Sequence, residues 1–161
     1  MGTNDPARAA AILRRAREEA RAAGSASVEA EHVLLAIAAH KGTEAQRILA
    51  TAGLDHVAIL EALDREFEES LAGAGVSLSA FGLPPVARRR DEVPRWGTSF
   101  KLAVRRAPRS GPGERLDATR LLLGILRAQV GIVPRALSLA GVDRAGLVAR
   151  TEEVLTAGAP H

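Results

Sequence analysis

Glu31 and His32 are an adjacent pair of titratable residues from which a binding site could be built. Ser27 precedes them as the expected N-cap of a helix that runs to about Ala39. Glu31 then falls in the first turns, where a carboxylate complements the positive end of the helix dipole. That dipole effect explains Glu31 on structural grounds alone, and the alternative is that its carboxylate binds a ligand. We expect His32 to be a partly buried structural residue.

The polar residues give no pattern for catalysis. No Ser-His-Asp grouping and no pair of carboxylates stands out, so the sequence predicts that the chain is not an enzyme and needs no cofactor. His40, His56 and His161 do not have metal-ligand spacing with His32. The chain has no cysteine, which excludes disulfides and thiolate metal sites. A hydrolase is a further hypothesis, and a turnover that is lost on replacing Glu31 or His32 would support it.

The composition favours packed helices. Of the 161 residues, 47% are hydrophobic but only 2% are aromatic, so the core must be built from Leu, Ile, Val and Ala. The net charge is only +3, which does not indicate a strongly basic surface. No signal-peptide pattern opens the sequence, and no apolar run approaches the ~20 residues that span a bilayer. We therefore expect a cytoplasmic location and no membrane partner.

An internal repeat sets the expected architecture. The segment Val28–Asp55 returns as Leu116–Asp143 at a constant offset of 88 residues. The residues that recur in this register include Leu34, Leu35, Ile37, Leu49 and Gly53. The repeat predicts an all-α fold of eight helices, arranged as two four-helix units with pseudo-twofold symmetry. We expect a single domain over 1–161, with repeat one at 7–71, a linker at 72–93 and repeat two at 94–155.

Capping and breaking residues mark the expected helices. Their expected starts are, in order, Pro6, Ser27, Thr43, Asp55, Pro94, Asp117, Ile132 and Asp143. The sixth helix is expected to end near Gln129. The fourth helix carries an apolar stripe that includes Val57, Leu60 and Phe67, and its outer face is acidic. Trp96 is expected to anchor the linker or the fifth helix.

The line EEARAAGSASVEAEHVLLAI, Glu18–Ile37, resembles the first repeat of the Clp N-terminal (Clp R) domain family. The family motif reads roughly EEA, a gap, and then G-T-E-H-hydrophobic-L-L. The turns at Gly53 and Gly141, and Pro94-Arg95 at the start of the second repeat, are also similar. The resemblance covers Ala7 to about Leu155. It implies a domain that docks adaptors and substrate proteins for ClpC-like or ClpB-like unfoldases. Because the chain has no G-x-x-x-x-G-K-[ST] loop, it resembles a free-standing ClpC-like N-domain protein.

The resemblance also implies a ligand. ClpC relatives bind phosphorylated arginine, which needs a carboxylate for the guanidinium and amide donors for the phosphate. The family's E-H pair is Glu31-His32 in repeat one, but Thr119-Arg120 stands at the matching place in repeat two. We therefore expect at most one such pocket, formed in repeat one by Glu31, His32 and Ser27.

Two functional interpretations follow from these residues. The first is a monomeric, non-enzymatic protein- or peptide-binding module that acts as an adaptor or regulator in Clp-dependent proteolysis. Its partners would be a ClpC-like unfoldase, adaptors or substrate proteins. The alternative is a nucleic-acid-associated regulator that uses Arg88–Arg90 in the linker. Three arginines beside Asp91-Glu92 are more typical of a solvated linker, so nucleic acid is the less favoured partner.

Overall fold

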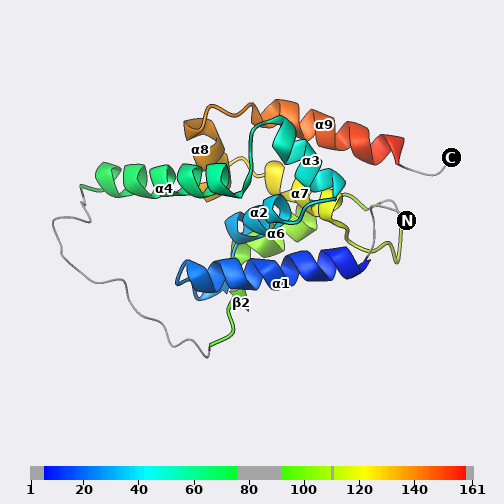
Figure 1. Cartoon of the computed structure of the whole chain (residues 1–161), viewed down its shortest axis with the longest axis horizontal. Coiled ribbons are helices and arrows are strands. Elements are labelled where there is room, and N and C mark those ends of the chain that lie inside the picture. Colours follow the sequence, from blue (N-terminus) through cyan, green and yellow to red (C-terminus); the bar gives the residue numbers. More distant parts are fainter. Residues whose placement is uncertain (1–5, 76–91, 110, 159–161) are drawn as a thin grey trace.

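The computed structural model describes residues 6–75, 92–109 and 111–158, which form an all-α fold (Figure 1). This part of the chain contains eight helices, so the prediction of an eight-helix all-α protein is confirmed. The helices are α1 (Pro6–Ala22), α2 (Ala30–Ala39), α3 (Glu44–Thr51), α4 (His56–Gly73), α6 (Thr98–Arg106), α7 (Ala118–Leu126), α8 (Ile132–Leu139) and α9 (Arg144–Ala157). Two short strands, β1 (Ser27–Val28) and β2 (Arg95–Trp96), complete it.

The strands correct two predicted helix starts. Ser27 does not cap α2 and Pro94 does not open a helix, because β1 pairs in parallel with β2 instead. The N–H of Arg95 donates to the carbonyl of Ala26, and a second bond of the same length, 2.9 Å, follows two residues later. Each helix therefore begins two residues after its strand ends. The two helix starts were predicted from local capping residues, and such residues do not indicate a pairing between segments so far apart in the sequence.

Helices α2 and α7 form the centre of the core. In α2 all residues from Ala30 to Ala38 except Glu31 are buried, and in α7 all residues except Arg120 are buried. Figure 1 shows these two helices in the middle of the molecule, with α1 and α9 on opposite sides. A helix that is apolar on almost every side must be covered by neighbours, which explains why the shorter and more polar helices surround this pair.

The same turn joins α3 to α4 and α8 to α9. Gly53 and Gly141 have φ angles of 72° and 71°, a conformation that glycine adopts without steric cost. The residue after each glycine donates its N–H, at 3.0 Å, to the carbonyl five residues back. Asp55 and Asp143 then accept a backbone N–H in the first turn of the next helix, at 2.8 and 3.0 Å. The turn signals in the sequence are thus built identically in both halves.

Two element ends differ from the prediction. Helix α4 continues to Gly73, two residues into the expected linker, and α7 stops at Leu126 instead of near Gln129. Most of the expected linker, including Arg88–Arg90, lies outside the described residues. Trp96 stacks on Phe100 of α6, with ring centroids 4.7 Å apart.

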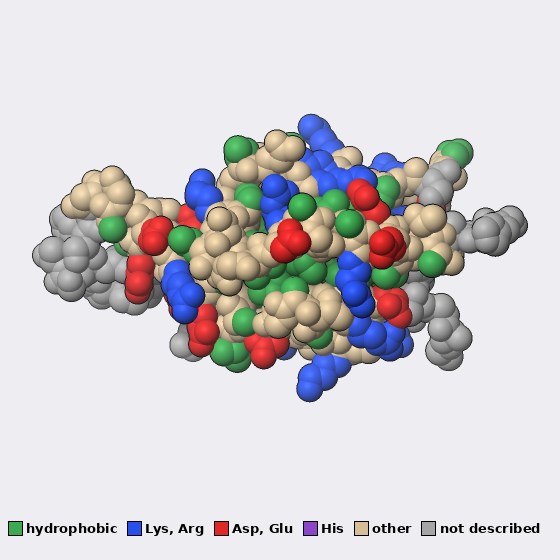
Figure 2. Space-filling model, turned by 90° about the horizontal axis from the view of Figure 1, so that it is seen from above, with side chains coloured by type: hydrophobic (Ala, Val, Ile, Leu, Met, Phe, Trp, Pro, Cys, Tyr) green, Lys and Arg blue, Asp and Glu red, His purple; other side chains and the backbone are tan. Residues whose placement is uncertain are grey.

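Charges of both signs are mixed on the face drawn in Figure 2, without a broad basic area. This agrees with the small net charge of the sequence. Among the described residues, no helix is both long enough and apolar enough to span a bilayer.

Candidate functional site

The structure brings Glu31 and His32 together in a groove between α1, α2 and α4, but Ser27 does not line it. The groove has a volume of about 920 Å³. Its carboxylates come from Glu18, Glu19, Glu31, Asp64 and Glu66. Its apolar lining comes from Leu35, Leu60, Leu63, Phe67 and, from α8, Ile132. Because Arg15 is the one arginine or lysine among the described residues that line it, we call this site the acidic groove.

Glu31 presents a carboxylate to the acidic groove from the first turn of α2. Burial raises the pKa of Glu31, and the neighbouring charges of Glu29 and Glu66 raise it further. Only a hydrogen bond to its own backbone opposes these effects. No arginine, lysine or histidine of the described residues forms an ion pair with Glu31. Its position therefore suits a cationic group brought by a ligand.

His32 is buried, with 5% of its surface exposed, and its side chain takes part in the N-terminal cap of α2. Its Nδ1 accepts the backbone N–H of Glu29 at 2.9 Å, so this nitrogen carries no proton. Burial lowers the pKa of His32 below its ordinary value, although the carboxylates of Glu29 and Glu19 act in the opposite direction. The ring is thus a neutral part of the helix cap.

Glu29, which sequence reasoning missed, joins the two halves of the chain. It is the N-cap residue of α2, and its carboxylate accepts the hydroxyl of Ser27 at 2.7 Å. It also accepts both the backbone N–H, at 3.0 Å, and the hydroxyl of Ser99 in α6. In return the Ser99 hydroxyl accepts the N–H of Ala30 at 2.8 Å. Ser27 therefore supports Glu29 instead of facing the groove.

A signal for Glu29 was present in the repeat. The offset of 88 residues places Asp117, which was predicted as a cap, on Glu29. It also places Arg120 on His32. In α7 the carboxylate of Asp117 accepts the backbone N–H of Arg120 at 2.9 Å. An acidic residue thus holds the N-cap position of both helices. Thr119, at the place of Glu31, is buried and offers no carboxylate.

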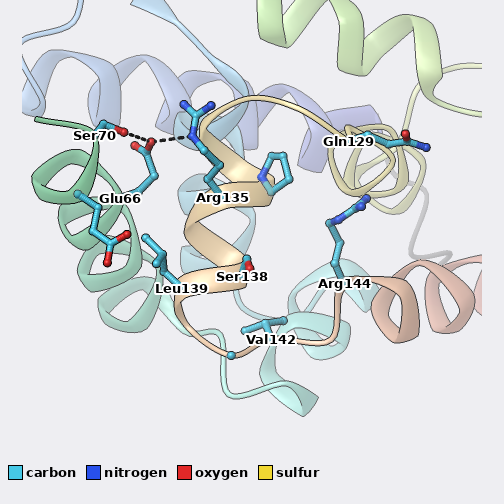
Figure 3. Close-up of a pocket in the computed structure, with 11 residues that line it drawn as sticks. Glu66, Ser70, Gln129, Arg135, Ser138, Leu139, Val142 and Arg144 are labelled. Atoms are coloured by element: carbon cyan, nitrogen blue, oxygen red, sulfur yellow. Dashed lines mark hydrogen bonds and ion pairs between the residues drawn. The ribbon is translucent and has the colours of Figure 1, made fainter. Parts of the chain in front are cut away.

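A second pocket of about 700 Å³ lies between α4 and α8. Figure 3 shows Glu66 of α4 and Arg135 of α8 pointing toward one another across it. The Arg135 Nε lies 3.0 Å from Oε1 of Glu66, which also accepts the hydroxyl of Ser70 at 2.6 Å. Arg144 lies on the other side of α8 and donates to a backbone carbonyl at 2.7 Å. Since Glu66 lines both sites, this pair holds one wall of the acidic groove in place.

The side chains that line the acidic groove define what it can offer a ligand. Its described lining has no serine, threonine, cysteine or lysine that could act as a nucleophile beside the two histidines. One of these, His56, contacts Glu19 through Nε2 at 2.7 Å, and Arg15 pairs with the same carboxylate at 3.0 Å. The described residues include no group of three His, Cys, Asp or Glu side chains that could hold a metal ion. What the groove offers a ligand is apolar area bordered by carboxylates.

A known protein family matches the segment of the chain that forms most of the acidic groove. Residues 6–80 match the family model of the Clp repeat (R) N-terminal domain, which confirms the resemblance for the first repeat. For the second repeat the resemblance stays a prediction. The matched segment includes α1, α2 and α4 and therefore nearly all of the acidic groove. No curated protein matches the chain. Domains of this family are docking and interaction domains of Clp systems. Over residues 6–80 the chain is therefore similar to the Clp repeat (R) N-terminal domain.

Proposed function

We propose that the chain is a non-enzymatic module that binds proteins through the acidic groove and acts as an adaptor or regulator in Clp-dependent proteolysis. The observation that carries the proposal is the groove itself. It lies almost wholly within the segment that matches the Clp repeat domain, and it leaves Phe67 52% and Leu60 38% exposed. Large apolar side chains gathered in a concave site are typical of protein-interaction surfaces.

The partner would be a ClpC-like unfoldase, one of its adaptors or one of its substrates. These 161 residues contain no P-loop, and they would act on an unfoldase by contact. Binding to the unfoldase and to a substrate together would deliver the substrate. Binding to only one of them would block its access to the other.

The test uses the purified chain and the purified ClpC-like unfoldase with its protease from the same source. We expect direct binding in biolayer interferometry and a changed rate of degradation of an unfolded substrate. A faster rate identifies an adaptor and a slower rate identifies a regulator that competes. Phe67→Ser should weaken both effects, whereas Glu68→Gln, at an exposed position on α4 outside the groove, should not. No binding together with an unchanged rate rejects the proposal.

Phosphoarginine is a second candidate ligand, because Glu31, which has no ion-pair partner among the described residues, offers a carboxylate to its guanidinium in a concave site. The guanidinium would bind Glu31, and His32 would line the same pocket. Calorimetric titration with a phosphoarginine peptide, its unphosphorylated counterpart and a Glu31→Ala variant tests this. Heat that requires both the phosphate and Glu31 would establish the pocket, and no heat with the wild-type chain would reject it.

The nucleic-acid alternative rests on Arg88–Arg90, which lie outside the described residues. It stays a prediction. Its test is a titration with duplex DNA at increasing salt, because binding through phosphates weakens steeply as salt rises. Binding that does not respond to salt would contradict it.

A further inference from the structure

One face of α4 presents apolar and acidic side chains alternately to the acidic groove. Leu60 and Phe67 are seven residues apart, so they lie two turns apart on the same side of the helix, and Asp64 lies between them. Ile132 of α8, which is 40% exposed, adds to the same apolar area. A ligand that covers this face must satisfy both kinds of side chain.

The carboxylates of the groove fall into two groups. Glu19 is paired with Arg15 and His56, and Glu66 is paired with Arg135. No ion pair with a described residue involves Glu18, Glu31 or Asp64. These three unpaired acids border the apolar area and give the groove a negative potential, which attracts cations and repels anions.

The start of α2 has few donors left for an anion. The N–H of Glu29 is bound to His32, the N–H of Ala30 is bound to Ser99, and the Glu31 carboxylate is itself bonded to backbone at this helix start. A phosphate at a helix N-terminus depends on such N–H groups. The site therefore offers a carboxylate to a guanidinium but few free N–H donors to a phosphate.

We propose that the acidic groove binds an unmodified basic segment of a partner protein, in which an arginine or lysine pairs with Glu31 and Asp64 while an apolar side chain covers Leu60 and Phe67. The inference deepens the proposed function, on which it rests, by naming the chemistry of the bound segment. Charge complementarity selects the segment, and the exposed apolar area supplies contact that a purely charged peptide would not use.

The test is fluorescence anisotropy of the full chain with a short labelled peptide that combines arginines and leucines. We expect binding that weakens as salt rises and that disappears when glutamates replace the arginines. Phe67→Ser and the double variant Glu31→Gln with Asp64→Asn should each reduce the affinity at least about fivefold, as for a central interface residue. Circular dichroism checks that the variants remain folded.

Glu68→Gln is the matched control, because it removes a carboxylate from the same helix outside the groove. It should leave the affinity unchanged. Equal binding of the glutamate peptide, tighter binding of a phosphoarginine version, or an equal loss in Glu68→Gln would each overturn the inference. So would no binding of the basic peptide. If the unfoldase still binds the chain in that last case, only this inference fails and the proposed function stands.

Discussion

Replacing Glu29 by alanine should destabilise the protein more than any other change at the start of α2. The carboxylate of Glu29 accepts one bond from Ser27 and two from Ser99, and so caps α6 from the opposite half of the chain. Loss of a helix cap costs about 1 kcal/mol of unfolding free energy. One further net hydrogen bond adds about 1 kcal/mol. We expect Glu29→Ala to lower the free energy of unfolding by about 2 kcal/mol, which corresponds to a Tm about 4–8 °C lower in a chain of this size.

Urea unfolding followed by circular dichroism measures this change. Glu31→Ala is the matched control, because it removes a carboxylate two residues away that has no ion-pair partner among the described residues. It should cost less than about 0.5 kcal/mol. A double-mutant cycle of Glu29→Ala with Ser99→Ala should give a coupling of about 1 kcal/mol. An unchanged midpoint in Glu29→Ala, or an equal loss in Glu31→Ala, would refute the role of Glu29.

The pH dependence gives a second readout of the same bonds. Burial raises the pKa of Glu29, but the hydrogen bonds from Ser99 and Ser27 lower it more, so the net pKa lies below its ordinary value of 4.5. A folded-state pKa below the unfolded value means that the unfolded chain binds the proton first. The contribution of Glu29 is therefore present above pH 4.5 and is lost as the pH falls through the folded pKa. Glu29→Ala should lack this loss.

Three further predictions concern other parts of the chain. Burial raises the pKa of Glu31 above 4.5, so its contribution to the unfolding free energy is lost as the pH rises through the folded pKa. Glu31→Gln should therefore be at least as stable as the wild type in urea unfolding at pH 7, and a clear loss of stability would contradict this. Burial lowers the pKa of His32 below 6.5, so the unfolding free energy should fall as the pH drops below 6.5. His32→Gln can still accept the N–H of Glu29, and it should not show this fall in a urea series at different pH values. In Gly124→Ala the new Cβ would lie 2.0 Å from the carbonyl oxygen of Ala103, so α6 and α7 must separate. We expect thermal unfolding to show a loss of about 2 kcal/mol or more in unfolding free energy, and an unchanged Tm would refute the close approach.

The sequence predicts those features of the fold that depend on local signals. Thr43, Asp55, Asp117 and Asp143 were expected to cap helices, and each accepts a backbone N–H in the first turn. Such caps need only a polar side chain directly before the helix, so they can be read from a few residues. The central helices could be predicted because the repeat keeps the same apolar positions in both halves.

Features that join distant segments could not be predicted in this way. The pairing of β1 with β2 and the bond between Glu29 and Ser99 link residues about 70 positions apart, and no periodicity records them. The apolar stripe of the fourth helix was expected, but half of Phe67 is exposed because no described element covers that side of α4. The acidic groove appears only when α1, α2 and α4 are placed together.

The most direct test of the binding site is an NMR titration of the isotopically labelled chain with the basic arginine–leucine peptide. The account predicts saturable shifts concentrated at the amides of Glu31, Leu60, Asp64 and Phe67, and small shifts elsewhere. Shifts centred instead on Arg144 and the pocket between α4 and α8, or no shifts at saturating peptide, would contradict the claim that the acidic groove is the docking site.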